Sequence, residues 1–240
     1  MGAGDRLVAV SNFEPPRGLT DKLPRVGDYQ TTDWERLASL RPGAMVTQFA
    51  ADRLPAGLVQ KSRDLGIELV NVPVTRLDDI YSAMQKLGVA IREPALGERA
   101  VSQLKAKLDG VAKNSAGRKV RALIVVDDSG RGVVGRDNYL NDVLEIAGGE
   151  NVIRPGTSPY PTIDPEMLNE ADPEVIFQIL AGASPQVLAR ARELWKTMPN
   201  LQAVRNARVH ILTDQYFMSP SQHVGELAEQ FAGALAEARQ

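Results

Sequence analysis

Short apolar runs alternate with longer amphipathic stretches along the 240 residues of this chain. The apolar runs are the expected strands, at residues 7–10, 44–47, 68–72, 120–126, 175–179 and 208–212. The expected helices lie at residues 32–41, 56–65, 96–111, 138–147, 165–170, 185–197 and 221–238. Strands that alternate with helices are typical of α/β proteins with parallel strands. The pattern therefore predicts an α/β fold with mainly parallel sheets.

Residues with known capping preferences sharpen several helix boundaries. Thr32 and Glu35 have the spacing of a capping box, in which each side chain bonds the backbone N–H of the other residue. Asp164 is a good N-cap, and Pro165 suits the first helical position because its missing N–H would have no partner there. Gly66 marks the end of the helix at 56–65.

The stretch at 96–111 carries apolar residues three, seven and ten positions after the first one. These residues are Val101, Leu104, Leu108 and Val111. The spacing places them on one face of a helix. We interpret residues 94–116 as a helix that connects an N-terminal lobe at 1–93 to a C-terminal lobe at 117–240. An ordinary surface helix is the alternative interpretation of the same pattern.

Composition and charge exclude several classes of function. The formal net charge is −2, so there is no electrostatic case for nucleic-acid binding, which needs clustered Lys and Arg. The chain has no cysteine, which excludes disulfides, thiolate catalysis and cysteine-based metal sites. No apolar run approaches the roughly 18 residues that span a bilayer. The sequence also shows no secretion signal before residues 7–10.

Motifs that would carry catalysis or metal binding are weak. The two histidines, His210 and His223, fall in a predicted strand and at the start of the last helix. A transition-metal site needs several ligands that converge, so we expect no metal site. The glycines of 130–135 fit a dinucleotide fingerprint in spacing, but no helix follows directly, and a cleft loop or hairpin is favoured. No nucleophile–base pair is visible, so we expect no enzyme.

Asp127 and Asp128 follow the apolar run at 120–126 directly. They could form a carboxylate pair for acid–base work or for a cation. A polar turn that continues into Ser129 is the favoured alternative. Ligands of α/β sheets usually bind just beyond the carboxyl ends of the strands, so Asp128 is a candidate ligand contact.

Aromatic residues are scarce, at 5% of the chain, so their placement is informative. Five of them fall in predicted loops at or just beyond strand ends: Tyr29, Phe49, Tyr160, Tyr216 and Phe217. Aromatic side chains bury a large area with few rotatable bonds, which suits a large flat ligand. For each residue taken alone, a loop anchor that packs on its own lobe is an equal alternative.

Five fragments in a fixed order carry a resemblance to a known family. They lie at residues 26–30, 33–43, 144–151, 163–168 and 203–209. In order and spacing they resemble the substrate-binding proteins of ABC importers that carry cobalamin, haem and iron-siderophores. The resemblance runs from Gly2 to the last helix. It implies two Rossmann-like lobes joined by one long backbone helix, a ligand bound in the cleft between the lobes, an extracytoplasmic location and no catalysis.

The resemblance also implies roles for particular residues. In cobalamin-binding members the segment that matches 28–30 faces the ligand, so Tyr29 would stack on the corrin and Gln30 would make a polar contact. The loop that matches 214–220 closes the cleft from the other lobe, although it lacks the basic or Trp residue of many relatives. Glu35 matches the first of two carboxylates that dock on the permease. The second carboxylate has no counterpart near Tyr216.

The resemblance leaves several hypotheses open. A corrinoid is the first choice of ligand, with haem, bound through an axial Tyr29, Tyr160 or Tyr216, or a ferric siderophore as alternatives. The predicted ligand contacts are Tyr29, Gln30, Phe49, Asp128, Tyr160, Tyr216 and Phe217. The first strand and helix of the family are missing from this sequence, so a truncated member that acts as an interaction protein is another possibility. The predicted partners are the ABC permease and, through an exposed edge of the N-terminal lobe, a second copy of the chain.

Overall fold

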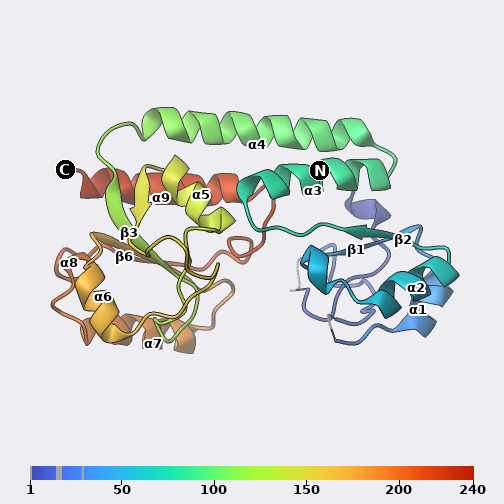
Figure 1. Cartoon of the computed structure of the whole chain (residues 1–240), viewed down its shortest axis with the longest axis horizontal. Coiled ribbons are helices and arrows are strands. Elements are labelled where there is room, and N and C mark those ends of the chain that lie inside the picture. Colours follow the sequence, from blue (N-terminus) through green and yellow to red (C-terminus); the bar gives the residue numbers. More distant parts are fainter. Residues whose placement is uncertain (1, 15–17, 29) are drawn as a thin grey trace. The chain divides into compact units, whose positions relative to one another are not determined.

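The structure is a computed structural model that describes residues 2–14, 18–28 and 30–240. The chain divides into two compact units (Figure 1). Unit 1 contains Met1–Val74 and Tyr81–Val101, and unit 2 contains Thr75–Ile80 and Ser102–Gln240. All pairs of named strands are parallel, which confirms the predicted α/β fold. The lobe boundaries inferred from the sequence stay a prediction. Among the described residues, no helix combines the length and the apolar character needed to cross a membrane.

Unit 1 is built on a sheet of two strands. Strand β1 (Ala44–Thr47) pairs with β2 (Glu68–Asn71), with Ala44 opposite Glu68. Helices α1 (Trp34–Leu40) and α2 (Ala56–Asp64) and the short turns η1 (Gly4–Arg6) and η2 (Ala51–Arg53) complete its elements before residue 75. The prediction placed a strand at 7–10, and this was wrong. Only Val10 is bridged, to Arg25, and Leu7 and Val8 are each 44% exposed, because no neighbouring strand extends the ladder past Val10.

The predicted capping box at the start of α1 was also wrong. The N-cap is Asp33, whose carboxylate accepts a hydrogen bond from the backbone N–H of Arg36 at 2.9 Å. Asp is as good an N-cap as Thr, and here it lies one residue closer to the helix. Glu35 is therefore an exposed residue of the first turn, with no capping role.

Helices α3 (Leu77–Ala90) and α4 (Pro94–Asn114) follow one another with a short turn between them (Figure 1). The apolar face predicted for α4 is confirmed, since its four residues are all buried: Val101, Leu104, Leu108 and Val111. Helix α3 was not predicted from the sequence. A Cβ added to Gly97 would lie 2.6 Å from the backbone oxygen of Met84, so this glycine permits the close approach of the two helices.

Unit 2 is built on a sheet of four strands in the order β4-β3-β5-β6. The strands are β3 (Val120–Val125), β4 (Gly149–Asn151), β5 (Val175–Ile179) and β6 (Val209–Leu212). The helices that follow α4 are α5 (Tyr139–Ile146), α6 (Pro165–Ala171), α7 (Pro185–Lys196), α8 (Gln202–Arg205) and α9 (Val224–Ala238). As predicted, Asp164 caps α6, with its carboxylate 2.8 Å from the backbone nitrogen of Met167.

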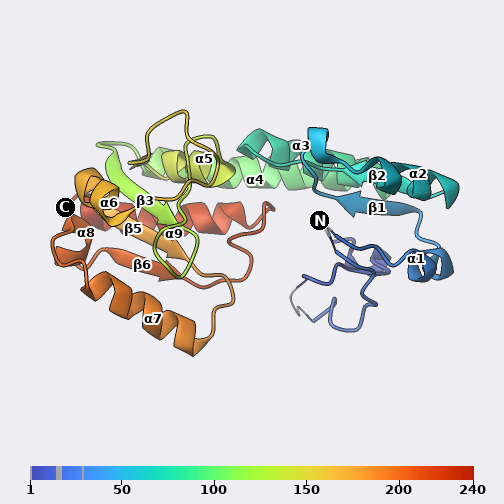
Figure 2. The ribbon, with the colours of Figure 1, turned by 60° about the horizontal axis from the view of Figure 1, so that its bottom comes forward.

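The four-stranded sheet is covered on both faces (Figure 2). On one face Ile176 of β5 packs in a core with Trp195 of α7 and Leu168 of α6. On the other face Phe177 packs on Phe231 of α9, with the ring centroids 4.3 Å apart. Neighbouring residues of β5 thus point to opposite layers, and all five of its residues are buried.

Candidate ligand-binding site

The carboxyl ends of the four parallel strands of unit 2 open at one edge of the sheet. Four loops leave that edge. The loop after β5 is short, at residues 180–184, and the other three are longer: residues 126–138 after β3, 152–164 after β4 and 213–223 after β6. We call these three longer loops the carboxyl-edge loops. From β3 the chain passes to β4 on one side, and from β4 it returns to β5 on the other side of β3. Such a reversal is the switch point at which open α/β sheets bind ligands.

Hydrogen bonds join two of the carboxyl-edge loops to each other and the third to α5. The backbone oxygen of Pro159 accepts from the backbone N–H of Gly135 at 3.0 Å and from the side-chain amide of Asn138 at 3.1 Å. The hydroxyl of Tyr139 donates to the backbone oxygen of Met218 at 3.1 Å. The loop after β3 is therefore bonded to the loop after β4, and the first residue of α5 is bonded to the loop after β6.

Asp127 and Asp128 form a polar turn, as the sequence analysis favoured. The Asp127 carboxylate accepts from the Ser129 hydroxyl at 2.9 Å and from the backbone N–H groups of Arg131 and Gly132 at 3.1 and 2.8 Å. Asp128 is exposed and pairs with Arg190 at 3.3 Å. The two carboxylates have separate partners, so they do not act as one acid–base pair.

The glycines of 130–135 belong to a hairpin, which confirms the preference over a dinucleotide loop. Val125 and Val133 form an antiparallel bridge, and Gly132 forms another with Thr162. A dinucleotide fingerprint instead requires its glycines to open a helix, where backbone N–H groups meet the pyrophosphate. The next helix, α5, begins at Tyr139.

The buried side-chain amide of Gln178 holds the residue at which this hairpin loop begins. The side chain of Gln178 on β5 is fully buried, and its Nε2 donates to the backbone oxygen of Asp127 at 2.8 Å. Its Oε1 accepts from the indole nitrogen of Trp195 at 2.8 Å. The Nε2 and Oε1 atoms of Gln178 both have hydrogen-bond partners, so burying the amide leaves neither atom unpaired. The contact therefore fixes the start of the loop without a desolvation penalty for an unpaired polar atom.

Tyr139 and Tyr160 lie at the same edge of the sheet but differ in exposure. Burial raises the pKa of the Tyr139 phenol, and the neighbouring Tyr160 adds a smaller effect in the same direction. Tyr139 therefore stays protonated and donates its hydrogen bond throughout the neutral range. Tyr160 is 49% exposed, so it presents an aromatic side chain at the surface of the loop after β4.

Tyr216 and Phe217 sit in the loop after β6 but have different surroundings. Tyr216 is half-buried, and its ring stacks on His223 with the centroids 4.2 Å apart. Phe217 is only 7% exposed, so its ring lies inside unit 2 and anchors the loop. Of the two, Tyr216 is the one whose ring reaches the surface.

The predicted site residues of unit 1 fall in two places. Phe49 follows the carboxyl end of β1, and the side chain of Asn71 holds its backbone at both the nitrogen, 2.9 Å, and the oxygen, 3.0 Å. Gln30 is exposed and its backbone N–H donates to Asp28, whose pKa is lowered by such bonds from Thr31 and Gln30. Tyr29 lies outside the described residues.

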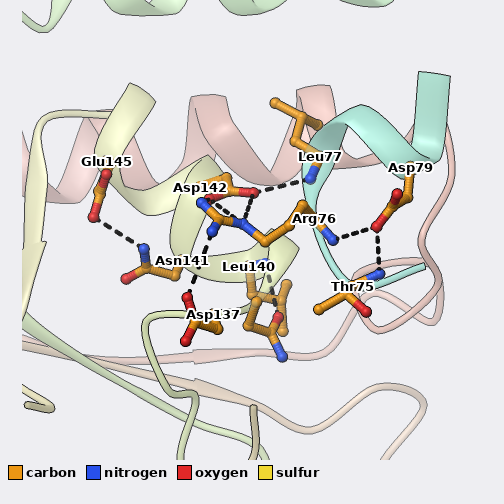
Figure 3. Close-up of polar contacts among 10 residues, drawn as sticks. Thr75, Arg76, Leu77, Asp79, Asp137, Leu140, Asn141, Asp142 and Glu145 are labelled. Atoms are coloured by element: carbon orange, nitrogen blue, oxygen red, sulfur yellow. Dashed lines mark hydrogen bonds and ion pairs between the residues drawn. The ribbon is translucent and has the colours of Figure 1, made fainter. Parts of the chain in front are cut away.

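Arg76 holds the start of α3 on unit 2 (Figure 3). Its Nε donates to both carboxylate oxygens of Asp142, at 3.1 and 2.9 Å, and the backbone N–H of Leu77 donates to the same carboxylate at 2.9 Å. The hydrogen bond to Asp142 raises the pKa of the Arg76 guanidinium. A second carboxylate, Asp79, accepts from the backbone N–H groups of Thr75 and Arg76. Asp142 belongs to α5, and its contact with Arg76 was not predicted from the sequence.

The histidines do not form a metal site. His210 stacks on Phe177 at 5.6 Å, and burial lowers the pKa of its imidazole. His223 instead faces Tyr216 and Glu226. In the part of the chain that the structure describes, no group of three or more His, Asp or Glu side chains could hold a metal ion.

Comparison with known families shows which protein family the chain belongs to. Residues 1–216 match the profile of the family described as "Periplasmic binding protein". The chain belongs to the periplasmic binding protein family. These proteins are substrate-binding components of transporters that work outside the cytoplasm, which confirms the family resemblance and the expectation that the chain is no enzyme.

Individual relatives carry more specific names. The chain is 27% identical to a vitamin B12-binding protein of Vibrio parahaemolyticus over 222 residues, which cover 92% of this chain and 78% of that protein. Its fold matches the crystal structure of the periplasmic vitamin B12-binding protein of Vibrio cholerae with a TM-score of 0.79 at 24% identity, covering 100% and 91% of the two chains. A periplasmic haem-binding protein of Pseudomonas aeruginosa gives a TM-score of 0.79 at 22% identity, with 97% and 86% covered.

Proposed function

We propose that this periplasmic binding protein binds a corrinoid and delivers it to the membrane subunits of an ABC importer. The relative named as a vitamin B12-binding protein, alignable over most of both chains, supports this choice of ligand. The structural observation that carries the proposal is the set of carboxyl-edge loops at a switch point of the sheet. Hydrogen bonds join the loops after β3 and β4 to each other and the loop after β6 to α5.

Tyr160 and Tyr216 are the ligand contacts that we propose on unit 2. Both rings reach the surface of carboxyl-edge loops, and an aromatic ring can stack on the flat face of a corrin at little cost in conformational entropy. Asp128 adds an exposed carboxylate at the same edge, although Arg190 already pairs with it. On unit 1 the contacts from Tyr29, Gln30 and Phe49 stay predictions of the sequence.

Haem is the second candidate ligand. Its support is the similarity in fold to a haem-binding protein, together with tyrosines at the carboxyl edge whose phenol oxygen could ligate iron. The carboxyl-edge loops offer no histidine other than His223, which is hydrogen-bonded to Glu226. A tyrosine-ligated haem is therefore the form that this site would hold.

Glu35 is the docking residue that we propose for the permease. It is exposed in the first turn of α1, where a carboxylate is free to meet a basic partner. Glu35→Lys should weaken the association with the membrane subunits and leave ligand affinity unchanged, as measured by co-purification and by titration. Equal loss of both would contradict the assignment.

Self-association through the edge of β1 is a further part of the proposal. Strand β1 has β2 as its only strand partner in the described part of the chain, and Val46 on β1 is 52% exposed. Free strand edges can pair with a second copy. Sedimentation equilibrium of the chain and of Val46→Lys tests this, because a charged residue on the strand should abolish any dimer.

The ligand proposal is tested by calorimetric titration of the purified chain with cyanocobalamin, and with haemin and a ferric hydroxamate in parallel. We expect micromolar or tighter binding of cyanocobalamin. Tyr216→Ala should weaken it at least about tenfold, equivalent to about 1.4 kcal/mol. Val89→Ala, which removes an exposed apolar side chain of α3, is the matched control and should bind as the wild type does. Tight binding of haemin alone would replace the corrinoid with haem.

A further inference from the structure

His223 and Glu226 form a pair beside Tyr216 that the proposed function does not yet use. The imidazole of His223 stacks on the Tyr216 ring with an interplanar angle of 24°. Its Nδ1 lies 2.6 Å from Oε2 of Glu226, one turn further along α9. The backbone N–H of His223 donates to the Ser221 hydroxyl at 3.3 Å. The imidazole is thus held by a ring on one side and a carboxylate on the other.

Glu226 is itself held by a lysine of α4. Its second oxygen lies 3.6 Å from Nζ of Lys107, and the same ammonium lies 3.0 Å from Glu229. The stem of Lys107 also packs on the start of α9, because a Cβ on Gly225 would come within 2.8 Å of its Cδ. The carboxylate that contacts His223 is therefore also paired with Lys107, at the end of a helix on which the Lys107 stem packs.

The backbone of Tyr216 is already fixed by its own loop. Its N–H donates to the Asp214 carboxylate at 2.8 Å, and its oxygen accepts from the N–H of Ser219 at 2.9 Å. Two residues on, Met218 accepts the hydrogen bond of Tyr139. The stacked imidazole of His223 contacts the side chain of Tyr216 and restricts the motion of its ring.

We propose that His223 is a positioning residue, which holds the ring of Tyr216 in the orientation that stacks on a flat macrocyclic ligand. Glu226 acts one step further back and fixes the plane of the imidazole. This inference rests on the proposed function. A side chain that is ordered before binding loses less freedom on binding, an effect of about two- to tenfold in affinity for one side chain.

The experiment is a set of cyanocobalamin titrations on the full chain. His223→Ala should weaken binding about two- to tenfold, and His223→Phe, which keeps a flat ring beside Tyr216, should restore most of it. Glu226→Ala should give a smaller loss, and Glu226→Gln, whose amide can still bond Nδ1, little. Glu229→Ala is the matched control, because it removes a partner of Lys107 and leaves the His223 pair intact.

Two further measurements separate positioning from a merely structural role. In a Tyr216→Ala background, His223→Ala should cost no additional affinity, since the ring that it positions is gone. With labelled tyrosine, the ring-proton resonances of Tyr216 in the free protein should shift in His223→Ala as the ring current of the imidazole is lost. The chain has only five tyrosines, so the assignment is practical.

The outcomes are distinct. A wild-type chain that binds cyanocobalamin with a His223→Ala variant of equal affinity would overturn the positioning role alone. The same conclusion holds if His223→Ala weakens binding equally with and without Tyr216. A wild-type chain that binds neither cyanocobalamin nor haemin would overturn the proposed function and, with it, the role of His223 in binding.

Discussion

The sheets of the two units differ in how completely their strands are buried. All residues of β5 in unit 2 are buried, whereas β1 of unit 1 has no fully buried residue and exposes Val46. The sheet of unit 2 has four strands with helices on both faces, and the sheet of unit 1 has two strands. A strand is buried on both faces only when both helix layers are complete. Unit 2 therefore provides the more rigid support for its loops.

The largest expected effect comes from the core of unit 2. Ile176→Ala removes a fully buried side chain and should cost about 2–5 kcal/mol of unfolding free energy, from lost burial and the cavity left behind. Val46→Ala in unit 1 should change stability by less than about 0.5 kcal/mol, because its side chain is half exposed. Denaturant unfolding measures both effects: Trp195 reports on unit 2 in a Trp34→Phe background, and Trp34 reports on unit 1 in a Trp195→Phe background. Equal effects at the two sites would remove the contrast between the units.

A smaller effect is expected at the anchor of α3. Asp142 is 13% exposed, and its carboxylate accepts from Arg76 and from the N–H of Leu77. Asp142→Ala should cost about 1–2 kcal/mol, since hydrogen bonds to charged groups are strong but Arg76 is half exposed. Asp137→Ala, at 3.6 Å from Arg76 and largely exposed, is the matched control. A loss for Asp137→Ala as large as for Asp142→Ala would show that long-range charge, and not the hydrogen bonds, holds the segment.

The smallest expected effect is on the pH dependence of stability, and it comes from His210 on β6, an edge strand of unit 2. Burial lowers the pKa of His210 below its ordinary value of 6.5, and its Nε2 is buried without a partner. An imidazole with a depressed pKa in the fold stabilises unit 2 fully above pH 6.5 and loses this contribution as the pH falls through the lower folded value. His210→Phe should keep the stacking on Phe177 and reduce the loss of stability between neutral and acidic pH. Thermal unfolding scans at several pH values measure this loss of stability. An unchanged pH dependence in His210→Phe would show that His210 does not cause it.

Much of the fold followed from local patterns in the sequence. The apolar spacing on α4 and the N-cap Asp164 depend on residues within a few positions of one another, so the sequence displays them. The strand at 7–10 failed because a strand also needs a neighbour, which local sequence does not reveal. Helix α3 was missed although Leu77, Ile80 and Met84 are buried at helical spacing, a pattern that is local. Only the hydrogen bond from Leu77 to Asp142, 65 residues away, has no local signal in the sequence.

In the candidate site, too, features set by local sequence were predicted and contacts between distant residues were not. Tyr160 and Tyr216 were expected in loops beyond strand ends, and they lie there because turn signals and strand ends are local features. The bond from Tyr139 to Met218 joins residues 79 apart in the chain, and no pattern in the sequence indicates it. The stack of His223 on Tyr216 was missed because a histidine at the start of a helix is ordinary in sequence.

Hydrogen exchange of the full chain with and without saturating cyanocobalamin tests directly whether the carboxyl-edge loops hold the ligand. We predict slower exchange in these loops, at 126–138, 152–164 and 213–223, when the ligand is bound. Amides of β3 and β5 should exchange slowly in both states, because these strands are buried without ligand. Saturated binding with no change in any of the three loops would contradict the account, since the ligand would then be held elsewhere.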